Sequence, residues 1–147
     1  MPNERLRILF LSQFPPSPPS FGAQRRIHGL MSALARRNDV VGVSLITPEM
    51  NARECERAMG EYCSEVVLVP APPWQGATKR LLQLRALAST RSFESRSFEL
   101  PELQRALRRA LSASPVDVVN VELPFLAGQP LGVSPPGFPP PVRVLDE

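Results

Sequence analysis

The 147-residue chain predicts an α/β domain built on a doubly wound parallel sheet. Two observations lead to this prediction. Short apolar segments of strand length alternate with longer segments in which apolar residues recur every three or four positions. Several short segments are apolar at nearly every position, which is typical of strands that are covered on both faces. With 43% hydrophobic residues, a chain of this length can bury a core of its own.

The amino-terminal part of the chain predicts a β-α-β unit. Residues 6–11 are almost all apolar, which predicts a buried strand. Residues 23–37 predict an amphipathic helix, because apolar side chains recur on one face at Ile27, Leu30, Met31, Leu34 and Ala35. Asn38 and Asp39 end this helix, and residues 40–46 predict the second strand.

The rest of the chain continues the same alternation. In order, the patterns predict a weak helix at 49–62, a strand at 65–69, a basic helix at 78–88, a helix at 101–111, and strands at 116–121 and 142–145. A Gly- and Pro-rich loop at 124–141 separates the last two strands. The final strand has the composition of a central strand, which needs cover on both faces. We therefore expect residues 1–147 to be one domain of a longer protein.

The net charge of +3 and the pI near 9.5 are compatible with phosphates, anionic lipid or nucleic acid as partners. Residues 77–111 hold eight Lys or Arg and three Glu, so their net charge is more positive than that of the whole chain. This segment predicts either a face for anionic lipid headgroups or a solvated helix surface. Nucleic acid is not expected, because only Phe93 and Phe98 are interleaved with the basic residues.

The cysteines indicate neither a metal site nor a disulfide framework. Cys55 and Cys63 are eight residues apart, and the single histidine, His28, is far from both in sequence. The apolar run near the amino terminus is too short for a signal peptide or a membrane span. We therefore expect reduced thiols, no metal and a cytoplasmic protein, with peripheral contact to the inner face of a membrane as an option.

A Pro-rich loop at 14–21 is the first candidate for a site. Its prolines keep it extended, and Gly22 then opens a helix whose first turn carries Arg25 and Arg26. A helix start with basic side chains favours an anionic ligand such as a phosphate. The alternative is a turn with a glycine cap and solvated arginines. A single glycine in this turn argues against a dinucleotide or P-loop fingerprint.

Glu122 is the candidate catalytic residue. It comes directly after the strand predicted at 116–121, at the edge of the sheet where the Pro-rich loop also emerges. A carboxylate there can accept a hydrogen bond from a substrate hydroxyl or act as a base, although an acidic residue that caps a loop is equally compatible. His28 lies three residues after Arg25 and either shares its helix face over the crevice or is a half-buried helix residue.

Four stretches together resemble group 1 (family 4) glycosyltransferases. Residues 7–37 are similar to their opening strand, Pro-rich loop and helix ending in Ala-Leu-Ala. The resemblance continues in Ser92-Phe-Glu-Ser-Arg-Ser-Phe98, in Asp117-Val-Val-Asn-Val-Glu-Leu-Pro124 and in Val142-Arg-Val-Leu-Asp-Glu147. The order and spacing of these stretches carry the likeness, which covers nearly the whole chain.

The resemblance implies one Rossmann-like half of the two-domain GT-B architecture. Such halves hold mainly the acceptor, whereas the carboxyl-terminal domain, absent from this sequence, holds most of the nucleotide-sugar. By that likeness Glu122 lies beside the reacting sugar, and the donor phosphates approach Gly22, Ala23 and Arg25. The acceptor would contact Phe14, Phe21, His28, Asn120 and Pro124. Ala23 replaces a usual second glycine and Asn120 a common histidine, which are departures from the pattern.

The implied function is transfer of a sugar, with retention of configuration, from a nucleotide-sugar to a hydroxyl of a glycan, polysaccharide or lipid-linked acceptor. No metal or other cofactor is expected, because helix ends and basic side chains can balance the phosphate charge. Without its donor domain the chain is expected to be inactive. The alternative is a non-catalytic Rossmann-like binding or scaffolding module that presents its basic surface to a partner or a membrane.

Overall fold

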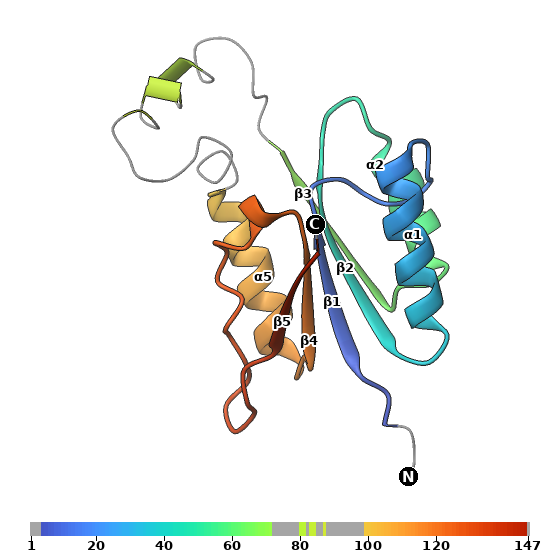
Figure 1. The fold of residues 1–147 in the computed structure, drawn as a ribbon, viewed down its shortest axis with the longest axis vertical. Coiled ribbons are helices and arrows are strands. Elements are labelled where there is room, and N and C mark those ends of the chain that lie inside the picture. The colour runs from blue at the N-terminus through green and yellow to red at the C-terminus, as the bar shows by residue number, and fades with distance from the viewer. Residues whose placement is uncertain (1–3, 72–79, 82, 85–86, 88–98, 147) are drawn as a thin grey trace.

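A computed structural model describes residues 4–71, 80, 81, 83, 84, 87 and 99–146. Five parallel strands form one sheet in the order β3-β2-β1-β4-β5 (Figure 1). Their bounds are Arg7–Ser12 for β1, Asp39–Ile46 for β2, Glu65–Pro70 for β3, Val118–Glu122 for β4 and Val142–Asp146 for β5. The prediction of a doubly wound parallel α/β fold is confirmed. The basic helix expected at 78–88 and the motif at 92–98 fall largely outside the described residues.

Helices cover both faces of the sheet (Figure 1). Helices α1 (Gly22–Ala35) and α2 (Ala52–Gly60) lie on one face, and α5 (Pro101–Ala113) lies on the other. All three were predicted, with ends that differ by up to three residues. The side chain of Asn51 accepts a hydrogen bond from the amide of Glu54 and so fixes the start of α2.

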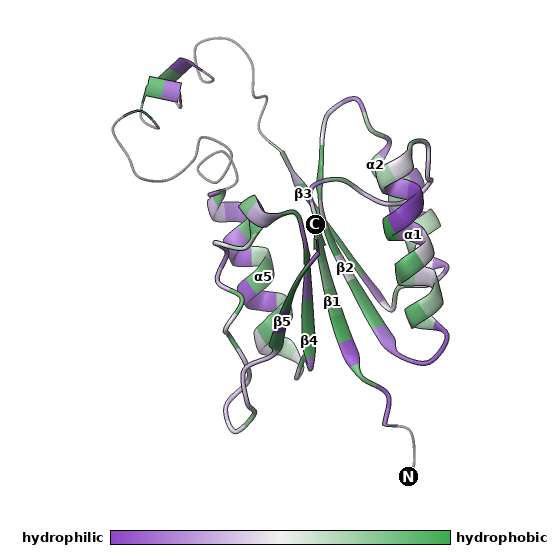
Figure 2. Ribbon diagram, in the orientation of Figure 1, coloured by the Kyte–Doolittle hydropathy of each residue, from purple (hydrophilic) through white to green (hydrophobic). Residues whose placement is uncertain are grey.

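The core forms two layers, one on each side of the sheet. On the α5 side the apolar stripe of the helix meets the inward side chains of the central strands, among them Leu9, Leu11, Val43, Val119, Leu103, Leu107 and Leu111. On the other side Ile27 and Met31 of α1 pack with Phe10 and Met59. Figure 2 shows hydrophobic central strands between helices that carry both hydrophobic and hydrophilic residues.

Strand β5 forms where it was predicted and has little cover. Its composition is typical of a central strand, but among the described residues it lies at the edge of the sheet and pairs with β4 alone. Val142, Val144 and Leu145 are accordingly 64%, 42% and 47% exposed. An apolar run indicates that a segment can form a strand. It does not indicate which segments cover that strand.

The parallel pairing sets the position of the candidate site. Strand β1 pairs with β2 on one side and with β4 on the other, so the order of the strands reverses between β1 and β4. All carboxyl ends meet at one edge of the sheet, and α1 begins there after the Pro-rich loop. In open α/β sheets this reversal point is where ligands bind.

Candidate functional site

The first turn of α1 is open to ligands. Phe21 precedes the helix without a side-chain cap, and the first turn contains no acidic residue. The amide groups of such a turn have no helical partners and carry a partial positive charge. A Cβ atom built on Gly22 would meet nothing within 4 Å, and Ala23 and Arg25 are exposed beside it. The structure therefore places the three residues predicted to bind phosphate together at one accessible helix end.

Glu122 lies in a group of four polar side chains, which we call the Glu122 cluster. It is the last residue of β4 rather than the first residue after the strand, and it is 1% exposed. Its Oε1 accepts a hydrogen bond from Nδ2 of Asn120 at 2.7 Å, and its Oε2 accepts one from Nη2 of Arg26 at 2.6 Å. Nη1 of Arg26 donates to Oδ2 of Asp146 at 2.7 Å. The cluster thus joins β4, α1 and β5.

Burial and the charge of Arg26 shift the pKa of Glu122 in opposite directions. Burial raises the pKa of this carboxyl above its ordinary value, and the negative charge of Asp146 raises it further. The Arg26 guanidinium and the Asn120 amide lower the pKa, but they do not cancel the effect of burial. The pKa of Arg26 is raised, chiefly by its hydrogen bond to Asp146. Arg26 is therefore the cation that makes a buried Glu122 carboxylate tolerable.

The sequence predicted Arg25 and Arg26 together at the helix start, but it assigned only Arg25 to the phosphate site and did not include Asp146. The two arginines point in different directions, because neighbouring helix residues are about 100° apart around the axis. Arg26 is the one that reaches the end of β4. The sequence did hold a signal for these two residues. Glu122 and Asp146 both end strands, and two neighbouring carboxylates need a cation such as Arg26 between them.

His28 contacts the Pro-rich loop and Tyr62, which follows the end of α2. Its Nδ1 lies 2.8 Å from Oγ of Ser17, which in turn lies 2.6 Å from the hydroxyl of Tyr62. The rings of His28 and Tyr62 meet edge to face at 5.2 Å. Ser17 is 2% exposed, and burial raises the pKa of Tyr62 to about 12. These contacts hold the loop against the helices, and they do not join His28 to the Glu122 cluster.

A second set of contacts fixes the loop from the other end. Nε2 of the buried Gln24 donates to the carbonyl of Pro15 at 2.8 Å, and its Oε1 accepts from the amide and the hydroxyl of Ser20. Phe14 and Phe21 pack edge to face at 5.0 Å. Of the residues expected to contact the acceptor, Asn120 is buried in the Glu122 cluster, Phe14 is half-buried, and Phe21 and Pro124 are exposed.

Replacing Ser17 by alanine is expected to lower the free energy of unfolding by about 1 kcal/mol, because the hydroxyl of the half-buried Tyr62 loses its partner. Urea denaturation at neutral pH measures this change. Tyr62→Phe in the Ser17→Ala background removes the orphaned hydroxyl and should recover part of the loss. An unchanged stability in Ser17→Ala would show that these hydrogen bonds do not hold the loop.

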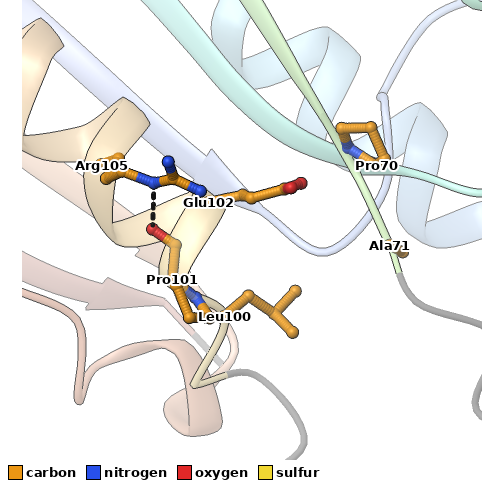
Figure 3. A pocket seen from close by; sticks show the side chains of 6 residues that line it. All are labelled: Pro70, Ala71, Leu100, Pro101, Glu102 and Arg105. Atoms are coloured by element: carbon orange, nitrogen blue, oxygen red, sulfur yellow. Dashed lines mark hydrogen bonds between the residues drawn. The ribbon is translucent and has the colours of Figure 1, made fainter.

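A hollow lies elsewhere on the same edge of the sheet. It has a volume of about 420 Å³ and is lined by Pro70, Ala71, Leu100, Pro101, Glu102 and Arg105. Figure 3 shows it between the carboxyl end of β3 and the first turn of α5, where Nε of Arg105 donates to the carbonyl of Pro101. We base the site on the Glu122 cluster and the start of α1, because they lie where the strand order reverses.

Two further features are absent from the described residues. These residues contain no group of three or more His, Cys, Asp or Glu side chains that could hold a metal ion. Within the same part of the chain, no helix has the length and apolar character needed to cross a membrane.

Comparison with known proteins identifies the class of fold and nothing finer. No family model matches the chain, and no curated protein matches it. Among solved structures, it is similar to the C-terminal domain of a hydrogenase from Pyrococcus furiosus, with 15% identity and a TM-score of 0.50. The match covers 84% of this chain and 78% of that chain. At this identity the likeness shows a shared α/β fold alone.

Proposed function

We propose that the chain is the acceptor-side, amino-terminal domain of a GT-B glycosyltransferase that moves a sugar from a nucleotide-sugar to a hydroxyl acceptor. One observation supports this most directly. The open first turn of α1 and the Glu122 cluster lie at the same edge of the sheet, at the point where the strand order reverses. A site for a phosphate beside a site for a hydroxyl is what such a transfer needs.

In this proposal Gly22, Ala23 and Arg25 steady the leaving diphosphate. The amides of the first turn can donate to phosphate oxygens, and the open space before Gly22 lets the phosphate approach the backbone. Arg25 is exposed and adds a positive charge there, whereas the charge of Arg26 is engaged by two carboxylates. The helix end and Arg25 together balance the negative charge of the leaving diphosphate, so the proposed transfer requires no metal. By the resemblance, the reacting sugar lies at the Glu122 cluster.

A non-catalytic binding module is the second candidate. Arg105, Arg108 and Arg109 are all exposed on α5, on the face of the sheet opposite α1. An exposed basic helix can bind an acidic partner or an anionic membrane surface without chemistry. The same surface would serve a transferase that works at the inner face of a membrane.

Titration of the isotope-labelled chain with UDP, GDP and their sugar conjugates tests the phosphate role. We expect amide chemical-shift changes centred on Gly22, Ala23 and Arg25. Arg25→Gln should weaken binding about tenfold, because a hydrogen bond to a charged group is lost. Arg36→Gln, at the other end of α1, serves as the matched control and should change little. Absence of shifts at Gly22 with every nucleotide, together with binding of anionic vesicles through α5, would favour the module.

An assay of the complete protein tests whether transfer occurs. Its incubation with a panel of nucleotide-sugars and hydroxyl acceptors should yield free nucleoside diphosphate in step with glycosylated product. Release of diphosphate without product would indicate hydrolysis and contradict the proposal.

A further inference from the structure

Only part of the Glu122 cluster is accessible to a ligand. The Glu122 side chain is 2% exposed, and both of its oxygens already accept hydrogen bonds. The side chains of Arg26 and Asp146 are 47% and 32% exposed. A ligand that arrives from solvent therefore meets the Arg26–Asp146 ion pair, with Glu122 behind Arg26.

The ion pair has a fixed position at the edge of the sheet. Asp146 lies opposite Glu122 in the parallel register of β4 and β5. Its carbonyl accepts a hydrogen bond from the amide of Leu123, which anchors the end of β5 to the chain that follows β4. Arg26 comes from the first turns of α1, close in sequence to Gly22. The pair is thus held by three elements rather than by a loop.

The chemistry of the pair suits a neutral hydroxyl group. A guanidinium has five N–H donors and a carboxylate about four acceptor positions, so the contact between Arg26 and Asp146 uses a fraction of them. An anion would be repelled by the carboxylates of Asp146 and Glu122, and a cation would be repelled by Arg26. A hydroxyl both donates and accepts, so it can bind the carboxylate and the guanidinium together.

We propose that Asp146 and Arg26 bind a hydroxyl of a sugar-like polyol, with Asp146 accepting from the hydroxyl and Arg26 donating to it, and that Glu122 is a positioning residue acting through Arg26. Assigning this hydroxyl to the acceptor rests on the proposed transferase function. The binding of a polyol does not require transfer and can be measured separately.

Titration of the isotope-labelled chain with methyl α-D-glucopyranoside, methyl α-D-mannopyranoside and myo-inositol tests the site, with inorganic phosphate as the anionic comparison. We expect the polyols to shift the Arg26 side-chain Nε–H, the Asp146 carboxyl carbon and the Leu123 amide. Asp146→Asn should weaken polyol binding about tenfold, because a hydrogen bond to a charged acceptor is lost.

Asp39→Asn is the matched control. Asp39 pairs with Arg7 at the opposite edge of the sheet, its side chain is also 32% exposed, and Arg7 likewise contacts a second carboxylate, that of Glu65. The control variant removes the same kind of ion pair and should leave polyol binding unchanged. Equal weakening in both variants would mean that the loss reflects general destabilisation, and it would overturn the proposed site.

The positioning role of Glu122 has its own readout. In the original chain, two charged partners should slow rotation of the Arg26 guanidinium enough for NMR to resolve its terminal nitrogens. Glu122→Gln keeps an acceptor for Asn120 but removes the charge that holds Arg26, so this slow rotation should be lost while the amide spectrum stays folded. If the Arg26 guanidinium rotates as slowly in Glu122→Gln as in the original chain, Glu122 does not position Arg26.

The results separate the two proposals. Polyol binding that depends on Asp146, in a complete protein inactive with every nucleotide-sugar, would support the site and contradict the transferase. Transfer by the complete protein with the same acceptor KM in Asp146→Asn would support the transferase and overturn the site. Shifts at Arg26 with phosphate and none with the polyols would also overturn the site.

Discussion

Replacing Arg26 by alanine is expected to lower the free energy of unfolding by about 3 kcal/mol at neutral pH, the low end of the scale for leaving a buried charge without its counter-ion. The Glu122 side chain is 2% exposed, and in the variant its charge would have the Asn120 amide as its remaining partner. Burying a charge without a counter-charge is far more costly than losing a surface contact. Urea denaturation measures the change.

The loss should depend on pH in a defined direction. The pKa of Glu122 is already raised above its ordinary 4.5, so the folded state holds this proton more tightly than the unfolded state does. Stability from this group is therefore present in full at low pH and decreases as the pH rises through 4.5 and on through the raised pKa. Arg26→Ala raises that pKa further. The difference from the original chain should be largest at neutral pH and should shrink as the pH approaches 4.5.

Two controls separate the charge effect from simple truncation. Arg25→Ala removes the neighbouring, exposed arginine and should change stability by about 0.5 kcal/mol or less. In a Glu122→Gln background, Arg26→Ala leaves no buried charge, so it should cost clearly less than in the original chain. An equal, pH-independent cost in both backgrounds would contradict the role given to Arg26.

The fold was predictable because its signals are local. The runs at 6–11, 40–46 and 65–69 and the helical stripe at 23–37 each match an observed element within a few residues. Apolar periodicity reports the conformation in which a segment can bury one or both faces. It does not show which segments lie beside a strand: β5 has the composition of a central strand but is an exposed edge among the described strands.

The candidate site was predictable only in part, for a related reason. Glu122 and Gly22 could be placed because parallel strands bring their carboxyl ends to one edge. Which of two adjacent arginines reaches Glu122 depends on the rotation of α1 about its axis. The contribution of Asp146 depends on the register between β4 and β5. Both are tertiary properties, and the pattern of a single segment does not contain them.

Gly42 is the second position where a large effect is expected, and substitution by valine should cost about 3 kcal/mol through overpacking. In β2 it lies in register with Phe10 of β1 and Val66 of β3. A Cβ atom built there would lie 2.6 Å from Cε of Met59, and Met59 is 0% exposed. The glycine is what allows α2 to pack its methionine directly on the strand.

The size of the effect should follow the size of the side chain at position 42. Met59 ends in a flexible thioether, so it can move aside for the single methyl group of alanine, and Gly42→Ala should cost about 1 kcal/mol. Valine adds two more methyl groups that would also crowd Cε of Met31 and Sγ of Cys63, each of which lies 3.4 Å from the built Cβ. Gly29→Ala in α1 is the control, because nothing lies within 4 Å of its built Cβ, and it should gain about 0.5–1 kcal/mol. A Gly42→Val chain with the thermal midpoint of the original would mean that α2 does not pack on β2 at this point.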